Sequence, residues 1–205
     1  MQGQNGTITV RDEKRKQRAI RKSLEYHLVK YCAPTLADLK TAGLFSLACE
    51  DQEALKEEVL LLDRVLRSKG LRLALLRAGE KKALIYCYRP KRLQEDLASE
   101  KACRMLRALG YCPGNSACML RALARKLRCD AEFPHEIGLF LGYPCEDVEG
   151  FILHKGKGCK CCADWKVYAD EEGCRRLFSQ FRQCRVNLLR RFCDGASIEE
   201  LAALS

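Results

Sequence analysis

The chain has 205 residues, of which 47% are hydrophobic and 31% charged, and this balance favours a folded domain over an intrinsically disordered chain. The formal net charge is +10. The start of the chain lacks the apolar core of a signal peptide, and no apolar run approaches the roughly 20 residues that span a bilayer. We therefore expect a cytoplasmic protein without a membrane partner, whose 14 cysteines remain thiols.

The first half of the chain predicts helices followed by one hairpin. Residues 12–31 have the pattern of a basic amphipathic helix. A break is expected at residues 32–35, where Pro34 would open a short second helix. Apolar residues at helical spacing predict another helix over 50–69. The segments 71–77 and 83–89 then read as two strands joined by a tight turn.

The second half is mainly helical, apart from a strand predicted at residues 165–168. Its helices are predicted from prolines or capping residues that precede apolar residues at helical spacing: 90–109, 116–129, 144–154 and a long helix that Asp170 caps. We therefore expect an α+β fold, a mainly helical single domain with a small, largely antiparallel sheet covered by helices. The sheet would combine the hairpin 71–89 with strand 165–168. Residues 1–10 are expected to be a flexible tail and residues 11–205 the globular domain.

Positive charge is concentrated in three stretches, residues 11–30, 101–130 and 175–193. A basic surface of this kind can attract nucleic acid or a small anionic ligand. No nucleic-acid-binding signature accompanies the charge, so ordinary solvated helix faces are the more frequent explanation. Both interpretations stay open from sequence alone.

Cys32 and His135 are candidate catalytic residues. Cys32 precedes the helix that Pro34 is expected to open, and a thiol at a helix N-terminus is activated by the unpaired backbone N–H groups. His135 follows Phe133-Pro134 and would act as the base if the fold brings the two together. The alternative is a buried Cys32 and a His135 that bonds within its own turn.

A second group of residues suggests a metal site for zinc or iron. His154, Cys159, Cys162 and Cys174, with Cys145 as a further candidate, offer the nitrogen and thiolate ligands that these metals prefer. The spacing from Cys159 to Cys162 lets two sulfurs reach one ion. The second correctly spaced pair of a strong zinc motif is missing, so a thiol-rich exposed loop is the competing interpretation.

The stretch FPHEIGLFLGYP, residues 133–144, predicts a helix and a tight corner that could frame a ligand pocket. Its candidate ligand-binding residues are His135, Glu136, Gly138, Gly142 and Tyr143. No glycine-rich nucleotide motif is present anywhere in the chain. Nearly all of the stretch can be explained by packing, except the pair His135-Glu136 at the helix start.

FPHEIGLFLGYP, followed by EDVEGFI at residues 146–152, resembles an uncharacterised bacterial family, domain of unknown function 3793. The resemblance also takes in CAPTLADLK from Cys32, the strands GLRLALL and ALIYCYRP, and WKVYAD. It implies no reaction, cofactor or catalytic residue. It does place Cys32, His135 and Glu136 inside the family's motifs, and the cysteines at 159–162 outside them.

Three functions remain open from the sequence. The best-supported one is a small-molecule or partner-binding regulatory module with a pocket around FPHEIGLFLGYP. The second is a thiol- and histidine-dependent enzyme that uses Cys32 and His135. The third is a zinc- or iron-binding protein that uses His154 and the cysteines of the CKCC loop.

Overall fold

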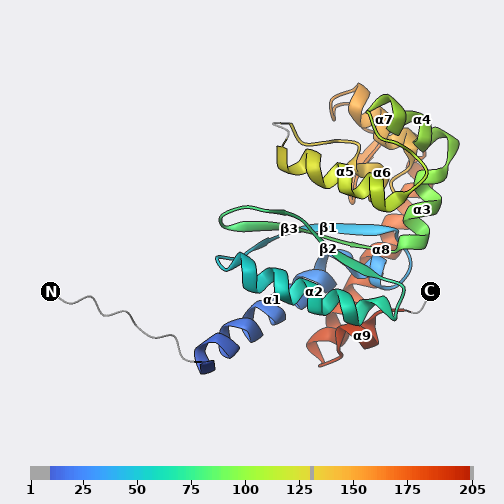
Figure 1. Cartoon of the computed structure of the whole chain (residues 1–205). Helices are drawn as coiled ribbons and strands as arrows, with labels where there is room; N and C mark the ends of the chain where they lie inside the picture. Colours follow the sequence, from blue (N-terminus) through green and yellow to red (C-terminus); the bar gives the residue numbers. More distant parts are fainter. Residues whose placement is uncertain (1–9, 130–131, 204–205) are drawn as a thin grey trace.

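The fold is taken from a computed structural model that describes residues 10–129 and 132–203 (Figure 1). A small sheet lies between two layers of helices, and a long helix runs along both layers. Within the described ranges, none of the helices combines the length and the apolar character needed to cross a bilayer. The predicted fold class, a mainly helical α+β fold with a small antiparallel sheet, is confirmed.

The sheet has three antiparallel strands, β1 (Ala42–Ala48), β2 (Arg72–Ala78) and β3 (Lys82–Tyr88), in the order β1-β3-β2. Side chains alternate between its two faces, as the period of two in a strand requires. Ile85 and Cys87 of β3 face one hydrophobic core, whereas Tyr86 faces the other. The sheet therefore separates two apolar cores.

The first core is covered by α1 (Val10–Leu36), α2 (Gln52–Arg67) and the short α9 (Ile198–Leu201), which lie below the sheet in Figure 1. Leu24, Leu28, Cys32 and Leu36 repeat every four residues along α1 and are fully buried against the sheet. This spacing puts them on one helix face, which explains the amphipathic pattern in the sequence.

The second core is covered by five shorter helices above the sheet. They are α3 (Pro90–Ala98), α4 (Glu100–Ala108), α5 (Ser116–Cys129), α6 (Ile137–Phe140) and α7 (Cys145–Leu153). Phe140 of α6 is fully buried, and its carbonyl accepts a hydrogen bond from the Tyr86 hydroxyl of β3 at 2.5 Å. The FPHEIGLFLGYP stretch is thereby fixed directly on the sheet.

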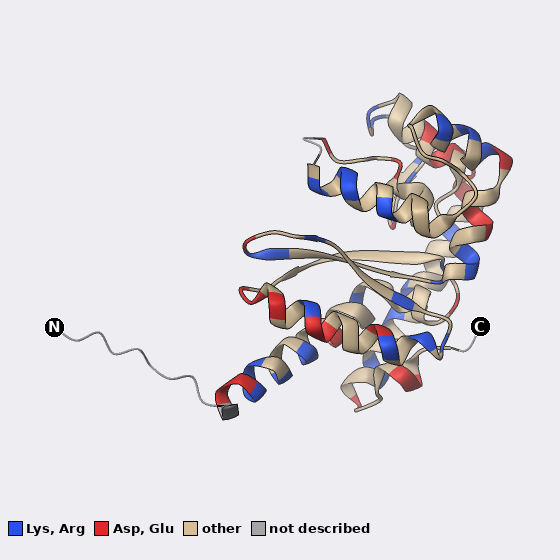
Figure 2. Cartoon of the chain, viewed as in Figure 1, with Lys and Arg blue, Asp and Glu red and all other residues tan. Residues whose placement is uncertain are grey.

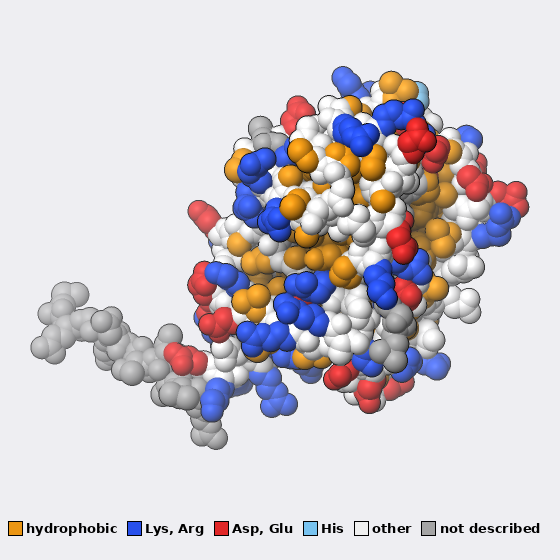
Figure 3. Space-filling model, turned by 45° about the vertical axis from the view of Figure 1, so that its right-hand side comes forward, with side chains coloured by type: hydrophobic (Ala, Val, Ile, Leu, Met, Phe, Trp, Pro, Cys, Tyr) orange, Lys and Arg blue, Asp and Glu red, His pale blue; other side chains and the backbone are white. Residues whose placement is uncertain are grey.

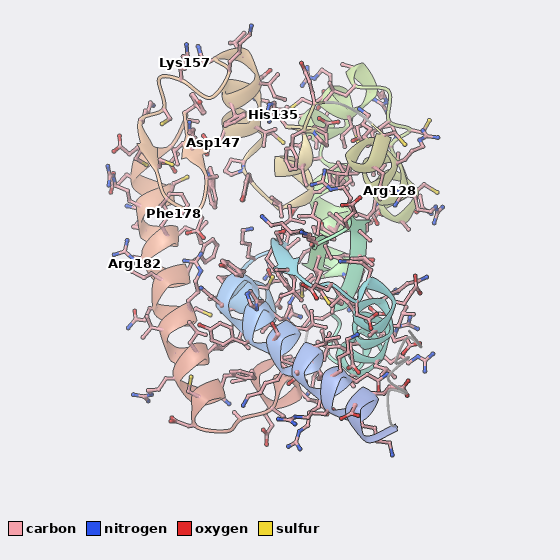
Figure 4. All side chains as sticks on the ribbon, turned by 90° about the vertical axis from the view of Figure 1, so that its left-hand side faces the viewer. Arg128, His135, Asp147, Lys157, Phe178 and Arg182 are labelled. Carbon is pink, nitrogen blue, oxygen red and sulfur yellow. The ribbon has the colours of Figure 1, made fainter. Side chains whose placement is uncertain are left out.

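The long helix α8 (Glu171–Cys193) connects the layers (Figures 1 and 4). Its first half packs on a two-stranded ribbon formed by β4 (Cys161–Cys162) and β5 (Lys166–Val167), where Trp165, Phe178 and Phe181 form a third apolar cluster. Its second half packs along α1, and Leu188 joins the first core. Lys and Arg are spread over several elements, among them α1, α5 and α8 (Figure 2).

Three details of the predicted fold need correction. The chain does not break at residues 32–35, because α1 continues through Pro34 to Leu36. Burial of the apolar face of α1 outweighs the one backbone hydrogen bond that Pro34 cannot donate. The third strand of the main sheet is Ala42–Ala48, whereas the strand predicted at 165–168 pairs with Cys161–Cys162 in a separate ribbon. The helix predicted over 90–109 is interrupted at Ser99, which caps α4.

Candidate functional site

A cleft of about 720 Å³ opens beside strand β1, between the end of α1 and the middle of α8. The segment that follows α6 and the loop between β4 and β5 close its other side. Four cationic side chains line the cleft, and we call it the basic cleft: Lys30, Lys40, Arg182 and Arg185. One carboxylate, that of Asp164, lines it as well.

α8 contributes one of its faces to the basic cleft. Phe178, Arg182, Arg185 and Leu189 follow at spacings of four, three and four residues, which places them on one side of a helix. In Figure 4, Phe178 and Arg182 follow one another along α8, and His135 and Asp147 lie above them. The arginine-rich segment of the sequence therefore directs two of its guanidinium groups toward this cleft.

The turn after α1 positions Lys40. The N–H of Leu39 bonds to the carbonyl of Pro34 at 2.8 Å and the N–H of Asp38 to that of Thr35 at 3.3 Å, which is the hydrogen-bond pattern of a Schellman motif. Asp38 occupies the left-handed position of the motif with φ 58°. Its carboxylate binds Arg89 at 3.0 Å and Arg92 at 2.6 Å, and these ion pairs hold a residue type that rarely adopts this conformation.

The ammonium group of Lys40 has few neighbours that offset its positive charge. It donates a hydrogen bond to the carbonyl of Ala42 at 2.5 Å and lies 4.8 Å from the ring centroid of Tyr143. The pKa of Lys40 is lowered from 10.5 to about 8, mainly by burial; the nearby Cys32 opposes this shift and Arg185 contributes to it. Lys40 forms no ion pair with any carboxylate of the described residues.

The other cations of the basic cleft differ in their partners. Arg185 is ion-paired with Asp164, and burial lowers the pKa of its guanidinium. Lys30 lies 5.2 Å from the ring centroid of Tyr31, and it forms no ion pair within the described part of the chain. Arg182 is exposed and, like Lys30, forms no ion pair with a carboxylate in the part of the chain that the structure describes. Three of the four cations are therefore without an acidic partner among the described residues.

Tyr143 forms the wall between the basic cleft and a second cavity. Its ring stacks on Trp165 at 4.7 Å between centroids, and its hydroxyl donates to the carbonyl of Asp164 at 3.2 Å. Burial raises the pKa of Tyr143 to about 12, against a smaller opposing effect of Arg185, so the hydroxyl stays protonated at neutral pH. Tyr143 is therefore a neutral aromatic wall and not an anion.

The second cavity has a volume of about 300 Å³, and we call it the His135 pocket. Aromatic side chains dominate its wall: Phe133, His135, Tyr143, Phe151 and Trp165. The ring of His135 lies 5.0 Å from that of Phe151, and the imidazole has no hydrogen bond to a described residue. On the face shown in Figure 3, apolar side chains also lie in the hollow between the upper helices and the sheet, with Lys and Arg beside them.

The predicted ligand-binding residues of FPHEIGLFLGYP separate into two groups. His135, Gly138 and Tyr143 line the His135 pocket. Glu136 is buried and points elsewhere, where it accepts hydrogen bonds from Tyr111 and Lys126, both at 2.9 Å. Its place at the helix start is explained by that ion pair.

Gly142 and Gly138 are required by close packing. A Cβ at Gly142 would lie 2.6 Å from the hydroxyl of Thr41, and the residue has φ +73°, a conformation that favours glycine. A Cβ at Gly138 would lie 2.7 Å from Val148 of α7. Both glycines let the corner fold onto its neighbours, and Gly142 lines neither of the two cavities.

The predicted catalytic pair, Cys32 and His135, is not brought together. Cys32 is fully buried in the core below the sheet, next to Gly43 and Cys87, whereas His135 is exposed above the sheet. The expected helix N-terminus at Cys32 is wrong, because the residue lies in the last turns of α1. The physical reason for an activated thiolate at this position is therefore absent.

The predicted metal ligands are not gathered into one cluster. His154 stacks on Tyr168, Cys162 is exposed at the His135 pocket, and Cys174 is buried on α8 with its sulfur 3.8 Å from a carboxylate oxygen of Asp147. Cys159 is half-buried in the loop between α7 and β4, and Cys145 begins α7. Among the residues that the structure describes, no three His, Cys, Asp or Glu side chains are arranged to hold a metal ion.

The sequence analysis missed the cations of the basic cleft as a group. Lys40 ends the CAPTLADLK segment, but its contact with Tyr143, more than 100 residues away, depends on the tertiary fold. The spacing of Phe178, Arg182, Arg185 and Leu189 was a usable signal, since it places two arginines beside two apolar residues on one helix face.

Comparison with known protein families gives a match. The sequence model of the family described as "Protein of unknown function (DUF3793)" matches residues 28–202. No curated protein and no solved structure matches the chain. The matched range contains every residue that lines the basic cleft and the His135 pocket.

Proposed function

Since this chain belongs to the DUF3793 family of proteins of unknown function, we propose from the geometry of its basic cleft that the protein binds a small anionic molecule there. The ligand would carry a phosphate or carboxylate group close to Lys40. We retain the hypothesis of a binding module and place the anionic contact in the basic cleft, on the other side of Tyr143 from His135.

The state of Lys40 is the observation that carries the proposal. A half-buried ammonium group with one carbonyl, one aromatic ring and no described carboxylate beside it is poorly solvated in the free protein. A bound anion would supply the missing opposite charge at a place that already excludes part of the water. Charge-assisted hydrogen bonds of this kind are stronger than neutral ones.

The surrounding charges favour the same kind of ligand. Lys30 and Arg182 add two cations without described acidic partners, and Asp164 balances only Arg185. Clefts lined by one sign of charge raise the local concentration of ions of opposite sign. The lining therefore supports a ligand with at least one full negative charge.

The size and the walls of the basic cleft support a small molecule. Its volume of about 720 Å³ lies within the range of roughly 300–1,000 Å³ that is usual for small-molecule sites. Tyr31, Tyr143 and Phe178 offer apolar surface between the cations. Such a mixture of a few charged groups with aromatic walls is typical of ligand pockets.

Calorimetric titration with inorganic phosphate, pyrophosphate and citrate tests the proposal. We expect at least one of these anions to bind, and we expect Lys40→Met and Arg182→Met each to weaken that binding about tenfold or more. Lys22→Met is the matched control, because Lys22 is exposed on the same helix as Lys30 and lies outside the cleft. Loss of binding in the control to the same extent would contradict a specific site.

A single-stranded oligonucleotide in the same titration separates a small-ligand site from general attraction of polyanions. General attraction would give binding that falls steeply with salt and responds equally to Lys22→Met and Lys40→Met. If the oligonucleotide binds in this way and none of the small anions binds, the proposal is wrong and the charge serves a polyanion surface.

A further inference from the structure

We infer that the anionic ligand also carries a planar ring, which occupies the His135 pocket while the charged group occupies the basic cleft. This inference rests on the proposed function and specifies the ligand as an aryl or heteroaryl phosphate or carboxylate. It is carried by the shared wall of the two cavities and by the aromatic lining of the smaller one.

The two cavities adjoin one another. Tyr143, Ala163 and Asp164 line both of them, so these three residues form the wall that the two cavities share. Ala163 is exposed and has the smallest side chain of the three. A ligand that crosses the wall at this residue meets little obstruction and reaches both cavities.

The lining of the His135 pocket suits a flat apolar group. Phe133, Phe151 and Trp165 present ring surface to it, and Phe133 is 46% exposed although it is large and apolar. Aromatic rings prefer offset-stacked or edge-to-face contact with other rings. A planar ring in the pocket would therefore gain specific contacts and cover exposed apolar surface.

The polar groups at the base of this pocket are already engaged. Asp147 accepts hydrogen bonds from the Trp165 indole at 2.8 Å and from two backbone N–H groups, and Lys166 donates to the carbonyl of Gly156 at 2.6 Å. Among the lining side chains with nitrogen or oxygen atoms, the imidazole of His135 forms no hydrogen bond to a described residue. The pocket thus offers apolar surface and one polar group at its rim, as a heteroaromatic ring would require.

The volumes agree with a ligand made of two parts. The His135 pocket, at about 300 Å³, has room for one ring system but not for a long chain. The basic cleft, at about 720 Å³, has room for a solvated anionic group and a linker. One molecule bound across both would bury its apolar part and neutralise Lys40 at the same time.

Calorimetry with three related probes tests the inference on the full chain. Inorganic phosphate carries only the charge, 1-naphthol carries only the ring, and 1-naphthyl phosphate carries both. We expect 1-naphthyl phosphate to bind about ten to a hundred times more tightly than inorganic phosphate, because its ring is removed from water. AMP, with a longer link between ring and phosphate, is a fourth probe that covers a greater span.

A variant that fills the His135 pocket separates the two parts of the site. Cys162 is exposed on β4 and lines the pocket, so Cys162→Phe should occupy it without disturbing a core residue. We expect this variant to lose the advantage of the ring and to keep the affinity for inorganic phosphate within about twofold. Cys193→Phe is the matched control, because Cys193 is exposed at the end of α8 and lines neither cavity.

The outcomes distinguish this inference from the proposed function. If phosphate binds and neither 1-naphthyl phosphate nor AMP binds more tightly, the anion site stands and the ring pocket is refuted. If ring-bearing probes bind more tightly but Cys162→Phe changes nothing, the ring lies elsewhere and the inference is also refuted. If no probe binds, both the inference and phosphate as the anion of the proposed function fail.

Discussion

Replacement of Lys40 by methionine should make the unliganded protein more stable, which is the reverse of the usual effect of a mutation in a folded domain. Methionine retains most of the apolar stem of lysine and removes the charge. A residue whose removal stabilises the protein while it weakens binding is typical of a functional site that is held in an unfavourable state.

The size of the effect follows from the pKa of Lys40. A change from 10.5 in the unfolded chain to about 8 in the folded protein corresponds to about 3 kcal/mol against the charged form. Methionine also loses the hydrogen bond to the carbonyl of Ala42, which is worth about 1 kcal/mol. We therefore expect Lys40→Met to raise the free energy of unfolding at pH 6.5 by about 1 to 3 kcal/mol.

The effect should depend on pH in one direction. Because the folded pKa of Lys40 lies below the unfolded one, the cost of its charge is fully present below pH 8 and disappears as the pH rises toward 10.5. At pH 9.5 the remaining cost is about 1 kcal/mol. The gain in stability from Lys40→Met should therefore shrink between pH 6.5 and pH 9.5. Both proteins carry the same other titrating groups, so the contributions of those groups cancel in the difference between the variant and wild type.

Urea unfolding under reducing conditions measures this difference, with Trp165 as the reporter because it is the single tryptophan of the chain. Lys22→Met serves as control and should change the free energy of unfolding by less than about 0.5 kcal/mol. If Lys40→Met is less stable than wild type at pH 6.5, or if its effect is the same at both pH values, the Lys40 ammonium is not poorly solvated. The main reason to place an anion beside it would then be gone.

Three further predictions concern residues that support the site. Asp38→Ala should destabilise the protein by about 1 kcal/mol more than Asp38→Gly in urea unfolding, because glycine alone adopts φ 58° without strain; equal effects would contradict this. Asp147→Ala should cost about 3 kcal/mol or more and change the Trp165 emission, since the buried indole N–H and two part-buried backbone N–H groups lose their acceptor; an unchanged spectrum would contradict it. Burial raises the pKa of Asp63, but hydrogen bonds from two arginines and one backbone N–H outweigh it and lower the pKa overall. The stability that the Asp63 carboxylate contributes should therefore be lost below about pH 4. The urea midpoints of wild type and Asp63→Asn should converge there, and a constant gap would contradict this.

The sequence was sufficient for elements whose pattern is local. Helices α2, α5, α7 and α8 and the β2–β3 hairpin were predicted from apolar spacing, caps and turns, and the structure contains all of them. Strand β1 was missed because Ala42–Ala48 is rich in small residues and its apolar side chains do not alternate cleanly with polar ones. Its conformation depends on pairing with β3, about 40 residues away, which a local pattern does not reveal.

The candidate site was predictable only in part for the same reason. The aromatic corner at His135 and Tyr143 is a local feature of the sequence, and both residues line the smaller cavity. The basic cleft joins Lys40 with Arg182 and Arg185, which lie more than 140 residues further along the chain. That contact requires α8 to pack along α1, and no spacing rule connects the two segments.

The arginines of α8 show how the fold separates ordinary surface charge from charge available to a ligand. Arg175 and Arg176, near the start of the helix, each pair with a glutamate one turn earlier, as expected for a solvated helix face. Arg182, two turns further along, faces the basic cleft without a described acidic partner. The arginines at the start of α8 are therefore those of an ordinary solvated helix face, whereas Arg182 in its middle fits the proposed ligand site. Exposed ion pairs such as those of Arg175 and Arg176 contribute little to stability. Our proposal of an anionic ligand rests on the unpaired cations of the cleft and not on the total charge of +10.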